Sequence, residues 1–108
     1  MQTSKAERYI GLCIKAGKLT CGFNALAAER KEVYLLILCA SASENAEKSA
    51  LKLKNKFGCE LLEYSRGLLE DLTGKPNAKI AAVREKNLAK AILSVLDDDL
   101  KIYSGGKG

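Results

Sequence analysis

Apolar residues recur along this chain in two alternating patterns, one with helical spacing and one typical of buried strands. Between residues 5 and 16 they return every three or four positions, which predicts an amphipathic helix. Ser4 and Glu7 form a capping-box pattern at its start, and Gly17 follows its end. Residues 33–40, in contrast, are apolar at every position, which predicts a central strand covered by helices on both faces.

The remaining segments continue the alternation of helix and strand. Strands are predicted over 18–21, 60–64 and 79–83, and helices over 23–31, 43–57, 65–72 and 85–96. The short link before the central strand and the helical crossover after it favour parallel pairs, although one antiparallel strand is common in a small sheet. The expected fold class is α/β, a three-layer α/β/α sandwich with a mixed four-stranded sheet.

A single domain accounts for this pattern, because 108 residues with 47% apolar composition can bury one core without repeats or linkers. We expect it to span residues 1–100, with residues 101–108 as a flexible glycine-rich tail. The longest apolar run is too short for a bilayer, and the N-terminal segment is amphipathic rather than a signal peptide. We therefore expect a monomer without a membrane segment.

The cysteines argue against metal and redox chemistry, because none has the close spacing of zinc ribbons or redox motifs and the chain lacks histidine. Cys13, Cys39 and Cys59 have apolar neighbours and are expected to be buried and reduced, which indicates the cytoplasm. Cys21 precedes a predicted helix, so a reactive thiol of lowered pKa is an alternative there. No nucleophile stands beside an evident base, so we expect no enzyme, no cofactor and no small-molecule substrate.

Charge favours a polyanionic partner. Lys and Arg number 18 against 13 Asp and Glu, which gives a net charge of +5. Small proteins also reach this balance without binding nucleic acid, so the charge alone does not decide the function. Lys48, Lys52 and Lys56 recur at the spacing of one helix turn, which suits either phosphate contacts or a solvated helix face.

The most informative stretch is the turn between the strand over 18–21 and the second helix. Gly22 lets another backbone come close, and Asn24 offers an amide with donor and acceptor edges. A helix that starts here directs its free N–H groups and positive dipole end outward, which makes an anion site. Lys18 flanks the turn and, with Lys15, is a candidate for phosphate contact.

Several segments carry a family resemblance through their order and spacing: 12–19, Gly22 with Asn24, 33–40, 42–45, 72–75 and 81–83. Together they resemble the kink-turn RNA-binding ribosomal protein family, the L-seven-Ae / L-thirty-e group, and especially its small bacterial members. The resemblance covers about residues 4–96. It implies a three-layer domain that docks the N-terminal end of its second helix onto a sharply kinked RNA built on tandem sheared G·A pairs.

In that family the turn reads Gly-x-Asn-Glu, followed one helical turn later by Lys, and its Asn, Glu and Lys reach guanine edges. The resemblance assigns RNA contact to Gly22, Phe23 and Asn24. Ala25 stands at the Glu position and Ala28 near the Lys position, so two base contacts worth about 1–3 kcal/mol each are missing. The expected recognition therefore depends on phosphates and RNA shape more than on sequence.

The family's second RNA contact is the loop before the last strand, which packs on a flipped-out nucleotide. The matching loop contains Lys75, which could reach a phosphate, Pro76, which gives a rigid apolar surface, and Asn77. An ordinary connecting loop is the alternative interpretation.

These observations predict a non-catalytic protein that binds structured, kink-turn-like RNA, such as ribosomal RNA, in association with translation. The alternative is a protein interaction or assembly module on the same fold with little RNA affinity. Ala25 and Ala28 favour that alternative, because they make the end of the second helix more apolar.

Overall fold

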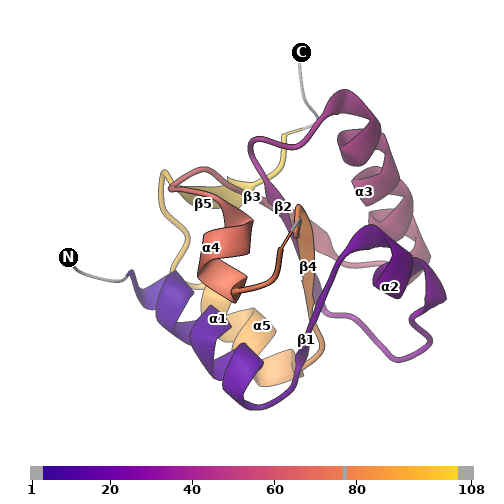
Figure 1. Ribbon diagram of the computed structural model, residues 1–108. Helices are drawn as coiled ribbons and strands as arrows, with labels where there is room; N and C mark the ends of the chain where they lie inside the picture. The colour runs from indigo at the N-terminus through magenta and orange to yellow at the C-terminus, as the bar shows by residue number, and fades with distance from the viewer. Residues whose placement is uncertain (1–3, 77, 105–108) are drawn as a thin grey trace.

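The computed structural model describes residues 4–76 and 78–104, which form one open, mixed five-stranded sheet with five helices (Figure 1). In chain order the elements are α1 (Lys5–Lys15), β1 (Leu19–Cys21), α2 (Phe23–Ala28), β2 (Leu35–Cys39), α3 (Glu44–Phe57), β3 (Glu60–Tyr64), α4 (Leu69–Thr73), β4 (Ile80–Val83), α5 (Lys86–Leu93) and β5 (Leu100–Ile102). The predicted alternation of helix and strand is confirmed. Among the described residues, no helix is long and apolar enough to cross a membrane.

The sheet has one strand more than the four predicted, in the order β1-β4-β2-β3-β5. Lys101 and Ile102, which were expected to start a tail, instead pair with β3 as part of β5. A carboxylate oxygen of Asp97 accepts a hydrogen bond from the backbone N–H of Leu100, the first residue of β5, at 2.9 Å. Three residues are too few to give a periodic signal, so pairing with β3 determines the strand. Residues 105–108 of the expected tail lie outside the described residues.

The directions of the strands also differ from the expectation of parallel pairs. β2 and β3 are parallel and joined through α3, as predicted, but β1–β4, β2–β4 and β3–β5 are antiparallel. The register shows where the chain re-enters the sheet. Ile80, the first residue of β4, lies opposite Leu38, whose partner in β3 is Glu63. β4 therefore starts at the end of the sheet where β3 finishes and runs in the opposite direction.

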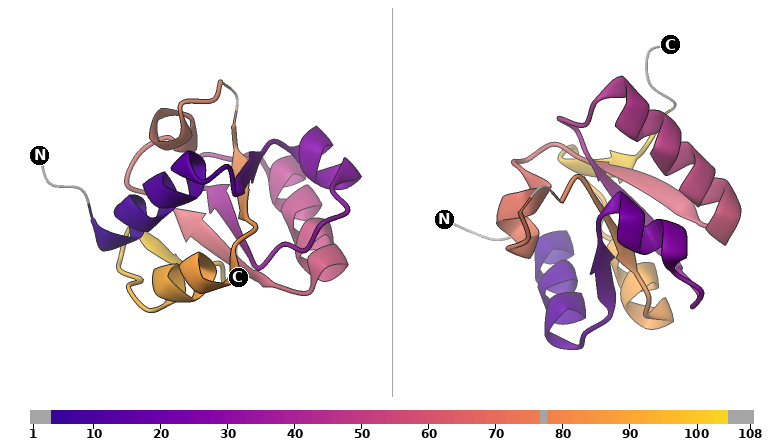
Figure 2. Two further views of the ribbon diagram at one scale, coloured as in Figure 1. Left: turned by 90° about the horizontal axis from the view of Figure 1, so that it is seen from below. Right: turned by 45° about the vertical axis from the view of Figure 1, so that its right-hand side comes forward.

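Helices lie on both sides of the sheet (Figure 2). The buried residues form two apolar clusters, one on each side of the sheet. Leu35, Ile37 and Cys39 of β2 pack with residues of α1, α4 and α5. The alternate residues Leu36 and Leu38 pack with residues of α2 and α3. All five residues of β2 are buried, which confirms the prediction of a central strand covered on both faces.

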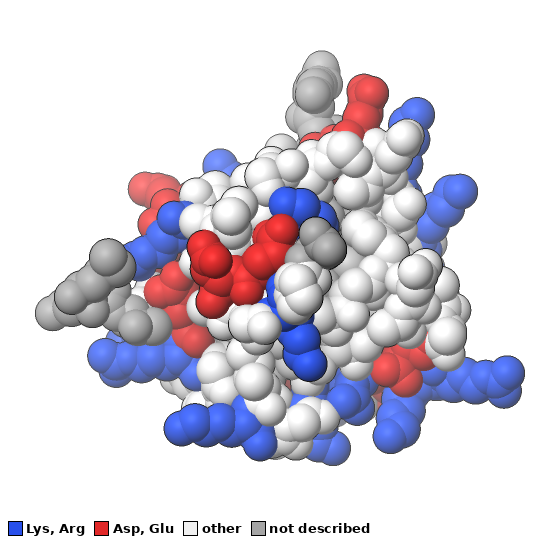
Figure 3. Space-filling model, in the orientation of Figure 1, with Lys and Arg blue, Asp and Glu red and all other residues white. Residues whose placement is uncertain are grey.

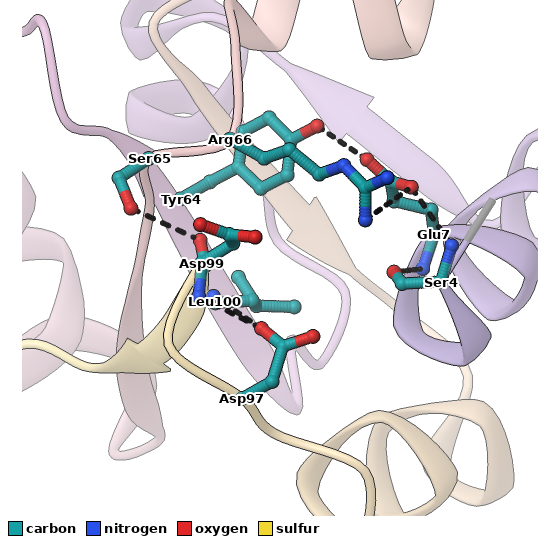
Figure 4. A network of polar contacts seen from close by, with 8 residues as sticks. All are labelled: Ser4, Glu7, Tyr64, Ser65, Arg66, Asp97, Asp99 and Leu100. Atoms are coloured by element: carbon teal, nitrogen blue, oxygen red, sulfur yellow. Dashed lines mark hydrogen bonds and ion pairs between the residues drawn. The ribbon is translucent and has the colours of Figure 1, made fainter. Parts of the chain in front are cut away.

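A polar network ties the start of α1 to the end of β3 (Figure 4). Ser4 and Glu7 form the predicted capping box, and the Tyr64 hydroxyl donates to Glu7 Oε2 at 2.6 Å. Burial raises the pKa of the Glu7 carboxyl, but the hydrogen bonds from Tyr64 and Ser4 and the charge of Arg66 outweigh burial and hold it below its ordinary value. Burial and the adjacent carboxylate raise the pKa of Tyr64, so at neutral pH the hydroxyl keeps the proton that it donates and Glu7 keeps its negative charge.

Candidate nucleic-acid interface

The turn predicted to contact RNA is held by the edge of the sheet. β1 ends with Cys21 opposite Ala81, and the N–H of Gly22 donates to the carbonyl of Ile80 at 3.0 Å. Gly22 has φ 98° and ψ 143°, a backbone conformation that residues with a side chain rarely adopt. A Cβ at this position would meet no heavy atom within 4 Å, so the space in front of the turn is open. Backbone conformation, rather than crowding within the protein, requires glycine here.

α2 starts immediately after this turn, at Phe23, and has no side-chain cap at its N-terminus. Phe23 is half-buried and packs against the cluster between the sheet, α2 and α3, so its ring anchors the turn. The side chains of Asn24, Ala25 and Ala28 are exposed. The turn therefore presents the Asn24 amide beside first-turn N–H groups that no side chain caps.

α2 is shorter than the predicted helix over 23–31, because Glu29 adopts an extended conformation and ends it. Residues 30–31 thus do not supply the basic last turn that the sequence suggested. The positive charge comes from α3 instead, where Lys56 Nζ donates to the carbonyls of Leu26 at 3.1 Å and Ala27 at 2.8 Å. Lys56 is consequently a cap for α2, and only Lys48 and Lys52 of the predicted lysine line remain without an assigned contact.

The second predicted segment converges on the same place. α4 ends at Thr73 with Gly74 as its C-cap, and the next two residues, Lys75 and Pro76, are exposed. Together with Gly22 and Cys21 they line a pocket of about 260 Å³, to which Leu19 and Ala78 also contribute. The Lys75 N–H donates to Thr73 Oγ1 at 3.3 Å, which orients the start of the loop. The candidate Asn77 lies outside the described residues.

Lys18 does not line this pocket, although the next residue, Leu19, does. Its N–H donates to the carbonyl of Cys13, and its carbonyl accepts the N–H of Arg84, both at 2.8 Å. Its side chain is exposed, as is that of Lys15. The candidate cations thus fall into two groups, with Lys75 at the pocket and Lys18 with Lys15 away from it.

Lys79 is a cation near the turn that the sequence reasoning missed. It directly precedes Ile80, whose carbonyl holds Gly22. Its Nζ lies 3.0 Å from Glu70 Oε2 and 3.4 Å from Ser41 Oγ, so its charge is partly neutralised within the protein. The position of Lys79 near the turn follows from the register of the β1–β4 pair, but the sequence alone does not show that these strands pair.

The alternative of a reactive thiol at Cys21 is not supported. Burial raises the pKa of Cys21 and outweighs the hydrogen bond with Thr73 and the positive charge of Lys75. Burial likewise raises the pKa values of Cys13 and Cys59 to about 11. Residues 4–76 and 78–104 contain no group of three or more Cys, Asp or Glu side chains that could hold a metal ion.

The charge distribution around the turn is uneven. Figure 3 shows a largely uncharged surface over α2 and the adjacent part of α3, with both cations and anions along its margins. A group of acidic side chains lies over α4, and further cations lie along the lower edge of the molecule. A larger groove of about 1230 Å³ lies between the link from α2 to β2 and the end of α3. It mixes Arg and Lys with Glu side chains and contains none of the predicted site residues, so it lacks the uniform charge of a phosphate site.

No protein-family model and no curated protein matches this sequence. Among solved structures, the chain is similar to one described as a protein with unknown function from Bacillus halodurans C. The TM-score is 0.70 at 19% sequence identity, over 86% of this chain and 97% of the other. The likeness extends over most of both chains and concerns the fold alone.

Proposed function

We propose that this is a non-catalytic protein that binds structured RNA with a kink-turn-like bend and acts in association with translation. In this proposal the domain is a cytoplasmic monomer with the three-layer α/β/α arrangement of the L-seven-Ae / L-thirty-e family. One observation carries it: the Gly22 turn and the loop of Lys75 and Pro76, which are far apart in sequence, line the same pocket.

The chemistry of that pocket suits an RNA backbone. Gly22 leaves open space for a close approach, and the Lys75 ammonium can pair with a phosphate. The Asn24 amide, which is exposed outside the pocket lining and two residues after Gly22, can bond a guanine edge. Alanines at positions 25 and 28 offer no polar contact to a base. Recognition therefore depends on the shape of the RNA and on phosphate contacts.

Electrophoretic mobility shifts with a kink-turn RNA and a plain duplex of equal length test this proposal. At about 50 mM salt we expect tighter binding to the kinked RNA and a steep loss of affinity as salt rises. Asn24→Ala should weaken binding to kinked RNA by about 1–3 kcal/mol, while Asn55→Ala, an equal change on an exposed site of α3, should not. Absence of binding at low salt would refute the proposal.

A second candidate function is a protein interaction module. The exposed Ala25 and Ala28 and the uncharged surface over α2 favour it. Ala25→Glu separates the two functions, because a carboxylate here would offer a base contact to RNA but would disturb an apolar protein interface. Tighter kink-turn binding by this variant supports the RNA function. If wild type retains a protein partner after nuclease treatment and this variant does not, without any gain in RNA affinity, the interaction module is supported.

A further inference from the structure

Cations from two helices gather at one end of the sheet, where α1 ends and α5 begins. The pairing of β1 with β4 sets Leu19 opposite Val83, and the Lys18 carbonyl accepts the Arg84 N–H at 2.8 Å. α1 and α5 also pack against each other (Figure 2). Four exposed lysines lie on or next to these ends and are called here the basic corner: Lys15, Lys18, Lys86 and Lys90.

The carboxylates near the basic corner are engaged elsewhere. Glu85 caps α5 by accepting the N–H of Leu88, and Glu29 lies 3.8 Å from Arg84. The single carboxylate of α1, Glu7, is held by Tyr64, and α5 itself contains no acidic residue. Within the described residues, none of the four corner lysines forms an ion pair. The corner therefore keeps its positive charge available to a partner.

Lys86 and Lys90 affect the fold in different ways, because Lys90 lies in the last turn of α5, where the helix dipole favours a cation. Lys86 is the first residue of α5, where its charge opposes the positive end of the helix dipole. Lys90 lies one helix turn further on, so the two ammonium groups repel each other. The Glu85 carboxylate at the N-cap offsets part of the first cost, and an external polyanion would remove the repulsion between the two lysines.

The distance from the turn indicates which part of an RNA would reach the corner. Lys18 lies four residues before Gly22, which corresponds to about 13 Å along an extended chain. That length equals about four base-pair steps along a duplex, at about 3.4 Å per step. A stem that leaves a kink held at the Gly22 turn and runs along β1 toward Lys18 would place its phosphates beside the corner.

We propose that the basic corner binds the phosphates of the duplex stem that continues from the kinked segment, so that the protein holds both the bend and its flanking helix. This inference rests on the proposed RNA-binding function. It extends the RNA contact beyond the pocket at Gly22 to α5, an element that none of the predicted site residues occupies.

The stem contact is tested by measuring how binding to two kink-turn RNAs depends on salt. In the first RNA the stem is cut close to the kink. In the second the stem has about eight further base pairs, which is enough to pass the basic corner. The test variant is Lys86→Gln/Lys90→Gln. The matched control is Lys48→Gln/Lys52→Gln, which also removes two exposed charges one turn apart, but on α3.

With the long stem, we expect the corner variant to reduce the slope of log affinity against log salt by about 2, since each phosphate contact contributes about 0.9. Between about 50 and 200 mM salt, the wild type should then lose about tenfold more affinity than this variant. With the short stem, the variant and the wild type should match, and the α3 control should match the wild type with both RNAs.

Three outcomes would overturn the inference. If the corner variant matches the wild type on the long stem while kinked RNA still binds, the corner has no stem contact and the RNA function stands. If both double variants lower the slope equally, the effect is one of net charge alone. If the wild type binds neither RNA, the proposed function fails and the corner proposal falls with it.

Discussion

Replacing Gly22 with alanine should destabilise the fold because of its backbone conformation. The residue has φ 98° and ψ 143°, and an added Cβ meets no heavy atom within 4 Å, so no steric contact contributes. Holding a residue with a side chain in such a region costs about 1–3 kcal/mol. Alanine also lowers the conformational entropy of the unfolded chain, which stabilises the fold by about 0.4–1 kcal/mol. The net result is a loss of about 1–2 kcal/mol in the free energy of unfolding.

Gly11 provides a matched control with the opposite sign. It lies inside α1, where its φ is not positive and an added Cβ also meets nothing within 4 Å. Gly11→Ala should therefore stabilise the protein by about 0.5–1 kcal/mol, because alanine loses less entropy than glycine in a helix. The chemical change is the same at both sites, so only the backbone conformation distinguishes them.

Urea unfolding followed by circular dichroism measures both variants. The midpoint should fall for Gly22→Ala and rise for Gly11→Ala, with the slope of free energy against urea unchanged in each. Gly22→Asn should be no more stable than Gly22→Ala, because a ψ of 143° lies outside the left-handed helical region that asparagine tolerates. If Gly22→Ala left the midpoint unchanged, the argument from backbone conformation would be wrong.

Three further predictions follow from contacts in the fold. Lys56→Met should lower the free energy of unfolding by about 1–2 kcal/mol, because α2 loses its C-terminal cap. The control variant Lys52→Met should change it by less than about 0.5 kcal/mol. If the two variants unfolded at the same urea midpoint, the capping role of Lys56 would be refuted. The pKa of Glu7 in the fold lies below its ordinary 4.5, so its contribution to stability is present above that pH and is lost as the pH falls through the folded pKa. Tyr64→Phe should reduce this acid-induced loss in unfolding titrations, and an unchanged pH profile would contradict the role of the Tyr64 hydroxyl. With the other cysteines replaced by alanine, Cys21 should react with a thiol reagent at neutral pH more slowly than free cysteine, because burial raises its pKa; a faster reaction would revive the reactive-thiol hypothesis.

Elements with strong local signals could be predicted from the sequence. The continuous apolar run over 33–40 identified β2, whose five residues are all buried, and β3 was predicted with the bounds that the structure has. The capping box of Ser4 and Glu7 likewise marked the start of α1. In these cases the pattern is long enough, or the cap specific enough, to determine the local structure without tertiary contacts.

The missed features depend on contacts between distant segments. β5 was missed because its three residues become a strand only by pairing with β3. The end of α2 was misplaced because its cap comes from Lys56, about 30 residues further along the chain. Lys79 was overlooked because its position beside the Gly22 turn follows from the β1–β4 pairing. The convergence of the two predicted loops was suggested only by family resemblance.

The pairing of β1 with β4 also has a consequence for the order of events during synthesis. Thr20 and Arg84, which bond across this pair, are 64 positions apart. At about 5–20 residues per second, the ribosome finishes β4 several seconds after β1 has been made. Until then no Ile80 carbonyl is present to hold the N–H of Gly22, so the nascent chain lacks the assembled turn. Under the proposed function, competence to bind RNA should therefore arise late in translation and all at once, rather than growing with the length of the nascent chain.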